Sequence, residues 1–144
     1  MRELPRQLTA AELAPLFSGR TRLVDELAGR EHPLEVAEEV ALALAAEDQV
    51  AALATHPRIG EPSEEQRGAE PEVLAELERL NEEYERRFGF SFVVFVNGRT
   101  RAEIVPVLRE RLARTRDEEL ETGLRALCEI ARSRWEQHRW TRTT

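Results

Sequence analysis

The sequence predicts an all-α fold, a single helical bundle of about seven or eight helices with an extended connector at about residues 90–97. Three observations predict this fold. Apolar residues recur at helical spacing along most of the chain, a threonine precedes a glutamate by three positions at three expected helix starts, and a run typical of a β-strand occurs only once. Because 144 residues suffice to build one core, we expect a single domain over residues 1–144.

The first two helices are expected to be short. Thr9 and Glu12 have the spacing of a capping box, so a helix begins at Ala10, and the small residues at 18–19 end it. Apolar residues then mark a second helix over residues 23–27, which the glycine that follows can end in the left-handed conformation.

The next stretch is strongly helical up to a proline-rich and glycine-rich segment. Pro33 suits the first turn of a helix, and residues 34–54 are rich in Ala, Leu, Val and Glu. The polar run at residues 47–49 predicts a break into two helices. Residues 55–68 lose the helical spacing, so this segment is expected to be a loop and to carry the chemistry.

A second helical region follows the loop. Residues 71–88 place apolar side chains on one face, and Gly89 ends that helix. Residues 90–96 have the composition of a buried strand, but a lone strand has no partner. We therefore expect an extended connector through the core, with a strand as the alternative.

Two further helices complete the fold. Capping boxes at residues 100–103 and 115–118 predict their first turns. The first helix is expected to end at Leu112, with a kink at Pro106, and the second near Trp135.

The composition excludes several classes of function. A net charge of −7 disfavours binding to nucleic acid, and no apolar run reaches the roughly 20 residues of a membrane helix. The first residues also lack the apolar segment of a secretory signal, so we expect a cytoplasmic protein without nucleic-acid or membrane partners. All 21 basic residues are arginines, and without lysine the chain has no side-chain amine for a Schiff base.

The cysteine and histidine residues point away from metal chemistry. Cys128 is the only cysteine, and His32, His56 and His138 lie far apart in the sequence. A disulfide framework and a cysteine-based metal site are therefore excluded, and we expect neither a metal nor a cofactor.

One histidine lies in an unusual local sequence. Pro57 pushes His56 out of the helical region just where the preceding helix is expected to end. The partial negative charge of a helix C-terminus favours the imidazolium form, so His56 is a candidate proton donor near neutral pH. The alternative is an ordinary loop histidine without a catalytic role.

Carboxylates and arginines lie close to His56 in the sequence. Glu64, Glu65 and Gln66 follow within the same loop, which could fold back beside the imidazole, although a solvated first helical turn also explains the two glutamates. An anionic substrate could bind to guanidinium groups in or after the irregular segments, namely those of Arg58, Arg67, Arg99 and Arg101.

Five motifs follow one another along the chain: His56-Pro57-Arg58-Ile59-Gly60, Ser63-Glu64-Glu65-Gln66, the segment from Glu83 to Phe92, Gly98-Arg99-Thr100 and Ile104. Taken in order, these motifs resemble those of the 2-oxo-4-hydroxy-4-carboxy-5-ureidoimidazoline (OHCU) decarboxylases. The resemblance covers nearly the whole chain. It implies an all-helical homodimer that completes the conversion of urate to (S)-allantoin without a cofactor and acts on a small ureidoimidazoline.

The resemblance also implies roles for individual residues. His56 matches the catalytic histidine and Glu65 a carboxylate that works with it on the substrate. The expected substrate-binding residues are Pro57, Ser63, Glu64, Gln66, Asn97, Gly98, Arg99, Thr100 and Arg101. Protonated His56 would then hydrogen-bond the substrate near its carboxylate or hydroxyl group, within a pocket that joins His56, Glu65 and the Asn97 turn.

Three positions depart from the family pattern. The stretch from Gly60 to Glu65 is shorter than in many members, so either Glu64 or Glu65 could face the substrate. Asn97 occupies a position where Arg or Lys is frequent, and Ser91 one where proline is common. Two other functions stay open: a non-catalytic helical interaction module, and an enzyme of the same fold that acts on a different ureido compound.

Overall fold

A computed structural model describes residues 4–57 and 71–142, with side chains up to residue 137. Within these ranges the chain forms seven α-helices and no β-strand, which confirms the all-α prediction. The helices are α1 (Ala10–Leu13), α2 (Arg22–Leu27), α3 (Pro33–Ala43), α4 (Ala46–Ala54), α5 (Pro71–Phe88), α6 (Arg101–Leu112) and α7 (Arg116–Arg142).

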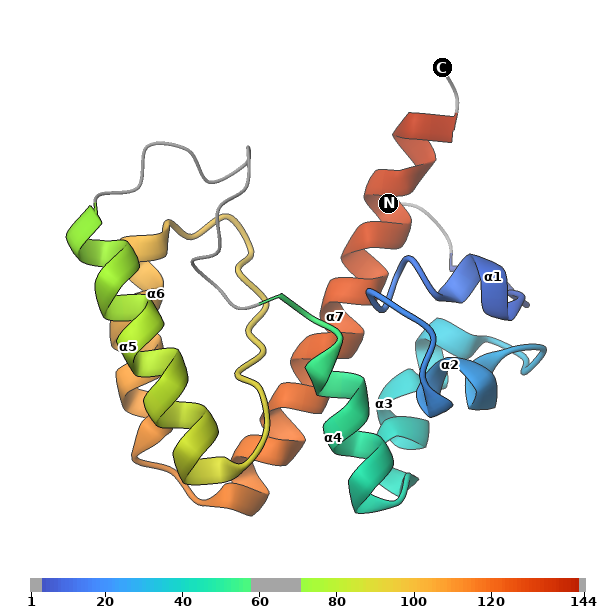
Figure 1. The fold of residues 1–144 in the computed structure, drawn as a ribbon. Coiled ribbons are helices and arrows are strands. Elements are labelled where there is room, and N and C mark those ends of the chain that lie inside the picture. Colours follow the sequence, from blue (N-terminus) through green and yellow to red (C-terminus); the bar gives the residue numbers. More distant parts are fainter. Residues whose placement is uncertain (1–3, 58–70, 143–144) are drawn as a thin grey trace.

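The long helix α7 crosses the molecule, with other helices on both sides of it (Figure 1). Helices α3 and α4 pack directly on α7, and α1 and α2 complete that half of the molecule. On the other side α5 and α6 lie side by side, and the connector between them runs through the space that separates this pair from α7. His56 and residues 97–101 therefore come from segments on either side of the middle of the molecule.

The capping boxes predicted from the sequence are present. At α1 the Thr9 hydroxyl oxygen accepts from the Glu12 amide at 3.1 Å, while a Glu12 carboxylate oxygen accepts from the Thr9 amide at 2.9 Å. Thr100 starts α6 in the same way, and Glu118 reaches back to Thr115 before α7. Each box satisfies amide groups that have no partner inside the helix.

The break between α3 and α4 differs from the expected one. The helices part at Leu44 and Ala45, so the polar residues 47–49 form the first turn of α4 instead of the break. Acidic side chains are favourable in a first turn, where the helix dipole is positive. The buried Gln49 side chain then donates to the carbonyl oxygens of Ala41 and Leu42, which closes the end of α3.

Two further helix ends differ from the predicted ones. Helix α1 ends at Leu13 instead of at residues 18–19, and α7 continues to Arg142 instead of ending near Trp135. No glycine or proline follows Trp135 before Arg142, so the sequence holds no residue that breaks a helix there.

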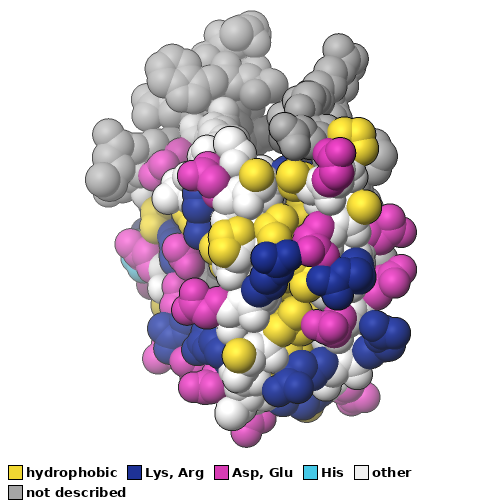
Figure 2. Space-filling view, turned by 90° about the vertical axis from the view of Figure 1, so that its left-hand side faces the viewer, with side chains coloured by type: hydrophobic (Ala, Val, Ile, Leu, Met, Phe, Trp, Pro, Cys, Tyr) yellow, Lys and Arg dark blue, Asp and Glu magenta, His cyan; other side chains and the backbone are white. Residues whose placement is uncertain are grey.

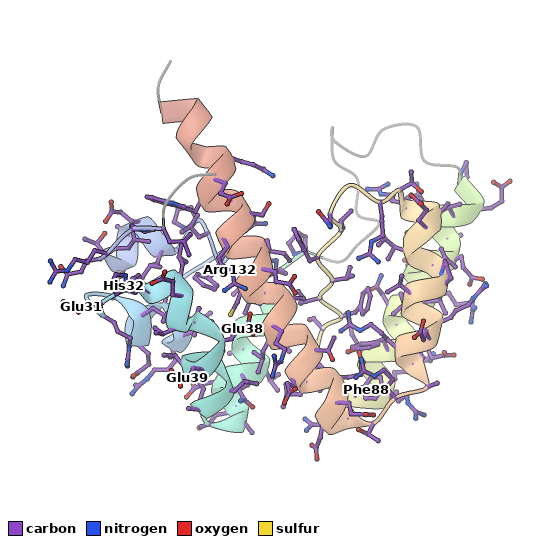
Figure 3. The ribbon with its side chains drawn as sticks, turned by 180° about the vertical axis from the view of Figure 1, so that it is seen from behind. Glu31, His32, Glu38, Glu39, Phe88 and Arg132 are labelled. Carbon is purple, nitrogen blue, oxygen red and sulfur yellow. The ribbon has the colours of Figure 1, made fainter. Side chains whose placement is uncertain are left out.

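Close contacts hold α7 to its neighbours. Gly123 allows the Leu53 side chain of α4 to approach, since a methyl group at this glycine would lie 3.3 Å from a Leu53 methyl carbon. Farther along α7, Arg132 donates to Glu38 of α3 at 2.8 Å and to the Leu34 carbonyl oxygen at 3.1 Å (Figure 3). These contacts fix α3 and α4 relative to α7, and with α4 the residue that follows its end.

The surface formed over α5 and α6 mixes arginines with acidic side chains (Figure 2). In the described part of the chain no helix has the length and apolar character needed to cross a bilayer.

Candidate active site

His56 lies directly after α4, where the last turn of the helix opens. Its amide donates to the Leu53 carbonyl oxygen at 3.3 Å, and the preceding Thr55 is the C-cap residue of α4. The Nε2 atom of His56 is buried and has no hydrogen-bond partner among the described residues. A buried polar atom without a partner is costly, so this nitrogen is suited to binding a group that the substrate supplies.

The residue before His56 ties the end of α4 to the loop that follows α1. The Thr55 hydroxyl lies 3.0 Å from the Phe17 carbonyl oxygen and 2.9 Å from that of Ala52. Gly19 packs closely against it, because a methyl group at this position would lie 3.4 Å from the Thr55 methyl carbon. The backbone of His56 is therefore held by a contact with the N-terminal part of the chain.

An arginine from α7 adds positive charge near His56. The Arg134 guanidinium donates to the Ser18 hydroxyl at 2.6 Å and to the Leu16 carbonyl oxygen at 3.2 Å. Ser18 has a φ of 63°, a left-handed conformation that lets the loop fold over the arginine. Sequence reasoning did not identify Arg134, because nothing in its spacing from His56 predicts that the two approach.

The charge of His56 also differs from the expectation. Burial, which disfavours the charged imidazolium, and then the positive charge of Arg134 lower the pKa of His56 to about 4. The imidazole is thus neutral near pH 7 in the free protein. The expectation that the helix C-terminus would favour the imidazolium form was wrong, because burial and the positive charge of Arg134 lower the pKa of His56 instead.

The second group of predicted site residues forms the turn before α6. Asn97 and Gly98 both have left-handed backbone conformations, with φ values of 48° and 80°. The Arg99 side chain folds back and donates to the carbonyl oxygens of Phe95 at 2.7 Å and Val96 at 3.0 Å. Arg99 therefore stabilises the turn itself.

The remaining members of this turn have different surroundings. Thr100 caps α6 with its hydroxyl oxygen, as described above. The Arg101 side chain is buried, and burial lowers its pKa. Pro57, beside His56, is exposed.

A cavity of about 610 Å³ lies against this turn, between the connector, α6 and α7. Asn97 and Arg99 belong to its lining, but His56 does not.

Several predicted site residues lie outside the described residues. These are Ser63, Glu64, Glu65 and Gln66, together with Arg58 and Arg67. The pocket that was expected to join His56, Glu65 and Asn97 thus stays a prediction. Among the side chains that the structure describes, no three of His, Cys, Asp or Glu gather in a group that could hold a metal ion.

Comparisons with known proteins agree on one family. A family model described as OHCU decarboxylase matches residues 3–136. The uric acid degradation bifunctional protein PucL of Bacillus subtilis (strain 168) is 34% identical over 100 residues, which cover 61% of this chain and 20% of that protein. The chain thus matches about a fifth of the length of this curated relative.

Solved structures have the same fold. A crystal structure of an OHCU decarboxylase in the presence of (S)-allantoin matches with a TM-score of 0.70 and 25% identity, over 78% of this chain and 87% of that one. An (S)-allantoin synthase matches with a TM-score of 0.66 and 18% identity, over 88% of this chain and 50% of the other. The second match is a likeness of fold.

Proposed function

This chain belongs to the OHCU decarboxylase family, and we propose that it converts OHCU to (S)-allantoin in the breakdown of urate. The observation that carries the proposal is the family match over residues 3–136, which includes His56, residues 58–70 and the turn before α6. The buried and unpartnered Nε2 of His56 supports it, because a nitrogen of this kind is ready to bind a ligand.

The reaction breaks the bond between the ring carbon and its carboxylate group. Carbon dioxide leaves, and the electron pair of the broken bond passes into the conjugated imidazoline ring. A proton must then reach one face of the carbon that becomes the stereocentre. These steps need hydrogen-bonding groups that hold the ring and a proton donor on one side.

His56 is neutral before the substrate arrives, so its role begins with a hydrogen bond to the substrate. A substrate carboxylate beside Nε2 adds negative charge and favours the imidazolium form. Binding then draws a proton onto His56, which can deliver it directly or through water after carbon dioxide leaves. Arg134 opposes this protonation and attracts the carboxylate at the same time.

The other family positions are proposed to hold the substrate. Glu65 orients the ureido and ring N–H groups, and the residues Pro57, Ser63, Glu64, Gln66, Asn97, Gly98, Arg99, Thr100 and Arg101 complete the site. We further propose that the protein is cytoplasmic and forms a homodimer. Light scattering on the purified protein tests the dimer, which would have twice the mass of the 16.5 kDa chain.

The test generates OHCU from urate with the two upstream enzymes and follows (S)-allantoin by circular dichroism. We expect the wild type to produce the S enantiomer rapidly and His56→Ala to lose at least about 100-fold in rate, the usual range for an acid–base residue. His32→Ala is the matched control, since His32 lies at the start of α3 and is exposed.

Two results would contradict the proposal. If the wild type only matches the slow and racemic decay of OHCU, the chain does not decarboxylate OHCU, and a different ureido compound is then the candidate substrate. If His56→Ala and His32→Ala are equally active, the reaction holds but His56 is not its catalytic residue.

A further inference from the structure

The loop after α1 contacts both the residue that precedes His56 and the arginine of α7 that lowers its pKa. We propose that this loop, residues 14–19, positions the catalytic histidine, and that Ser18 and Gly19 are its positioning residues. Gly19 acts on the backbone of the histidine, and Ser18 acts on the charge near it. The inference rests on the catalytic role proposed for His56, but its central test needs no substrate.

The loop is closed by a hydrogen bond of its own. The Gly19 amide donates to the Ala14 carbonyl oxygen at 2.9 Å, and Ser18 just before it has a φ of 63°. These two features match the Schellman motif, in which the left-handed position is usually a glycine. A serine there costs conformational energy, and strain of this kind points to a contact that the side chain is needed for.

The contact that a glycine would lack is the one with Arg134. The Ser18 hydroxyl oxygen accepts from Nη1 of Arg134 at 2.6 Å, and the same nitrogen donates to the carbonyl oxygens of Leu16 at 3.2 Å and Pro15 at 3.3 Å. Oxygens of one loop thus hold one end of the guanidinium. Because its charge disfavours the imidazolium form of His56, the place where the loop holds it affects how easily His56 takes up a proton.

Gly19 makes the second contact, with Thr55. The Thr55 hydroxyl lies 3.0 Å from the Phe17 carbonyl oxygen, and a methyl group on Gly19 would lie 3.4 Å from the Thr55 methyl carbon. Gly19 has a φ of 152°, a conformation that residues with a side chain rarely adopt. Alanine at this position would force the loop to change shape, and Thr55 and His56 would move with it.

The first experiment follows the ring protons of His56 by NMR titration in Ser18→Gly. Glycine relieves the backbone strain and removes the hydroxyl, so stability in urea should be nearly unchanged. The pKa of His56 should rise, because the Arg134 charge is held less firmly, but by less than in Arg134→Gln. The rise should vanish when Ser18→Gly is made together with Arg134→Gln. Ser133→Ala is the control, since its hydroxyl accepts from Gln137 instead.

The second experiment compares Gly19→Ala with Gly29→Ala. Both glycines have positive φ values, 152° and 74°, but a methyl group on Gly29 would meet nothing within 4 Å. Both variants should lose stability, because alanine is strained at either position. Only Gly19→Ala should also lower kcat for allantoin formation, by about tenfold and with little change in KM. A merely structural role for Gly19 would lower stability alone.

Three results would overturn the inference. The first is a pKa of His56 that does not rise in Ser18→Gly, and the second is a rise that persists when Arg134 is also replaced. The third is an equal kcat in Gly19→Ala and Gly29→Ala. If the wild type does not act on OHCU, the proposed function fails, while the titration still decides whether the loop sets the charge of His56.

Discussion

At the scale of single residues, the charge of His56 depends on the burial of its imidazole and on the positive charge of Arg134. Both lower the pKa of the imidazole, to about 4. Arg134→Gln removes the second cause, so the pKa of His56 should rise toward its ordinary value while burial keeps it below. An NMR titration of the ring protons measures this midpoint. Arg132→Gln is the control, and an equal shift in both variants would mean that Arg134 has no specific effect.

The same pKa gives a dependence of stability on pH. The pKa of His56 is lower in the folded than in the unfolded chain, so between about pH 6.5 and 4 the unfolded state binds more protons. Stability is therefore full above this window and falls as the pH drops through it. Between pH 7.5 and pH 5, the free energy of unfolding should fall in both proteins, but the fall should be up to about 2 kcal/mol smaller in His56→Gln than in the wild type. Urea unfolding at the two pH values measures the difference, and equal losses would contradict it.

Thr55 acts on His56 through the backbone. Thr55→Val keeps the shape of the side chain but loses the hydrogen bonds to Phe17 and Ala52, so we expect a loss of about 1 kcal/mol in stability and a lower kcat. Thr21→Val is the matched control, because Thr21 precedes α2 without a side-chain capping bond. Chemical unfolding and the allantoin assay measure the two effects. A normal kcat in Thr55→Val would show that this contact does not position His56.

The sequence predicts where His56 lies better than what surrounds it. The proline after it and the end of the helix before it are local features, and the structure has His56 at that place. Its protonation depends on Arg134, which approaches only because α7 packs on α4 and on the loop after α1. Contacts of this kind are not encoded by spacing along the chain.

At the scale of elements, the capping boxes were the most reliable sequence signal, since each depends on residues only three positions apart. Thr100→Ala should lower stability by about 1 kcal/mol, and it should also raise KM because the Asn97 turn leads directly into this cap. Thr9→Ala removes an equivalent box at α1 and should lower stability alone. Unfolding and kinetic measurements on both variants separate the effects; an unchanged KM in Thr100→Ala would mean that the turn does not bind substrate.

Element ends without such a local signal were less predictable. The polar residues 47–49 suit a break and a first helical turn equally well, and the Gln49 contact with Ala41 decides between them only after the helices pack. The end of α7 was placed too early because the sequence beyond Trp135 contains no residue that favours or forbids a helix end.

At the scale of the whole molecule, the connector is stabilised by long-range contacts. Residues 91–96 form neither helix nor strand, although their composition is typical of a strand. Phe92 packs against Tyr84 of α5, and Arg111 of α6 donates to the Val93 carbonyl oxygen. The bond from Arg111 satisfies one backbone carbonyl group that a neighbouring strand would otherwise satisfy, and the aromatic contact adds apolar packing.

Glu119 of α7 joins this arrangement to the rest of the molecule. Its fully buried carboxylate accepts from the Tyr84 hydroxyl and from Arg111, both at 2.7 Å, and forms an ion pair with Arg114 at 3.2 Å. Burial and the bond to Glu119 raise the pKa of Tyr84, so its hydroxyl stays a donor. The Glu119 carboxylate thus connects α5, α6 and α7, and Arg111 extends the network to the connector.

Glu119→Gln should therefore be among the most damaging single substitutions in the chain. It keeps the size of the side chain but leaves the buried Arg111 without its countercharge, and breaking a buried pair in this way costs about 3–5 kcal/mol. Glu121→Gln is the matched control on the same helix, because Glu121 is exposed and its pair with Arg125 should contribute at most about 1 kcal/mol. Urea unfolding measures both. Equal losses in the two variants would mean that the Glu119 network does not hold the two sides of the molecule together, and the connector would then depend on its aromatic packing alone.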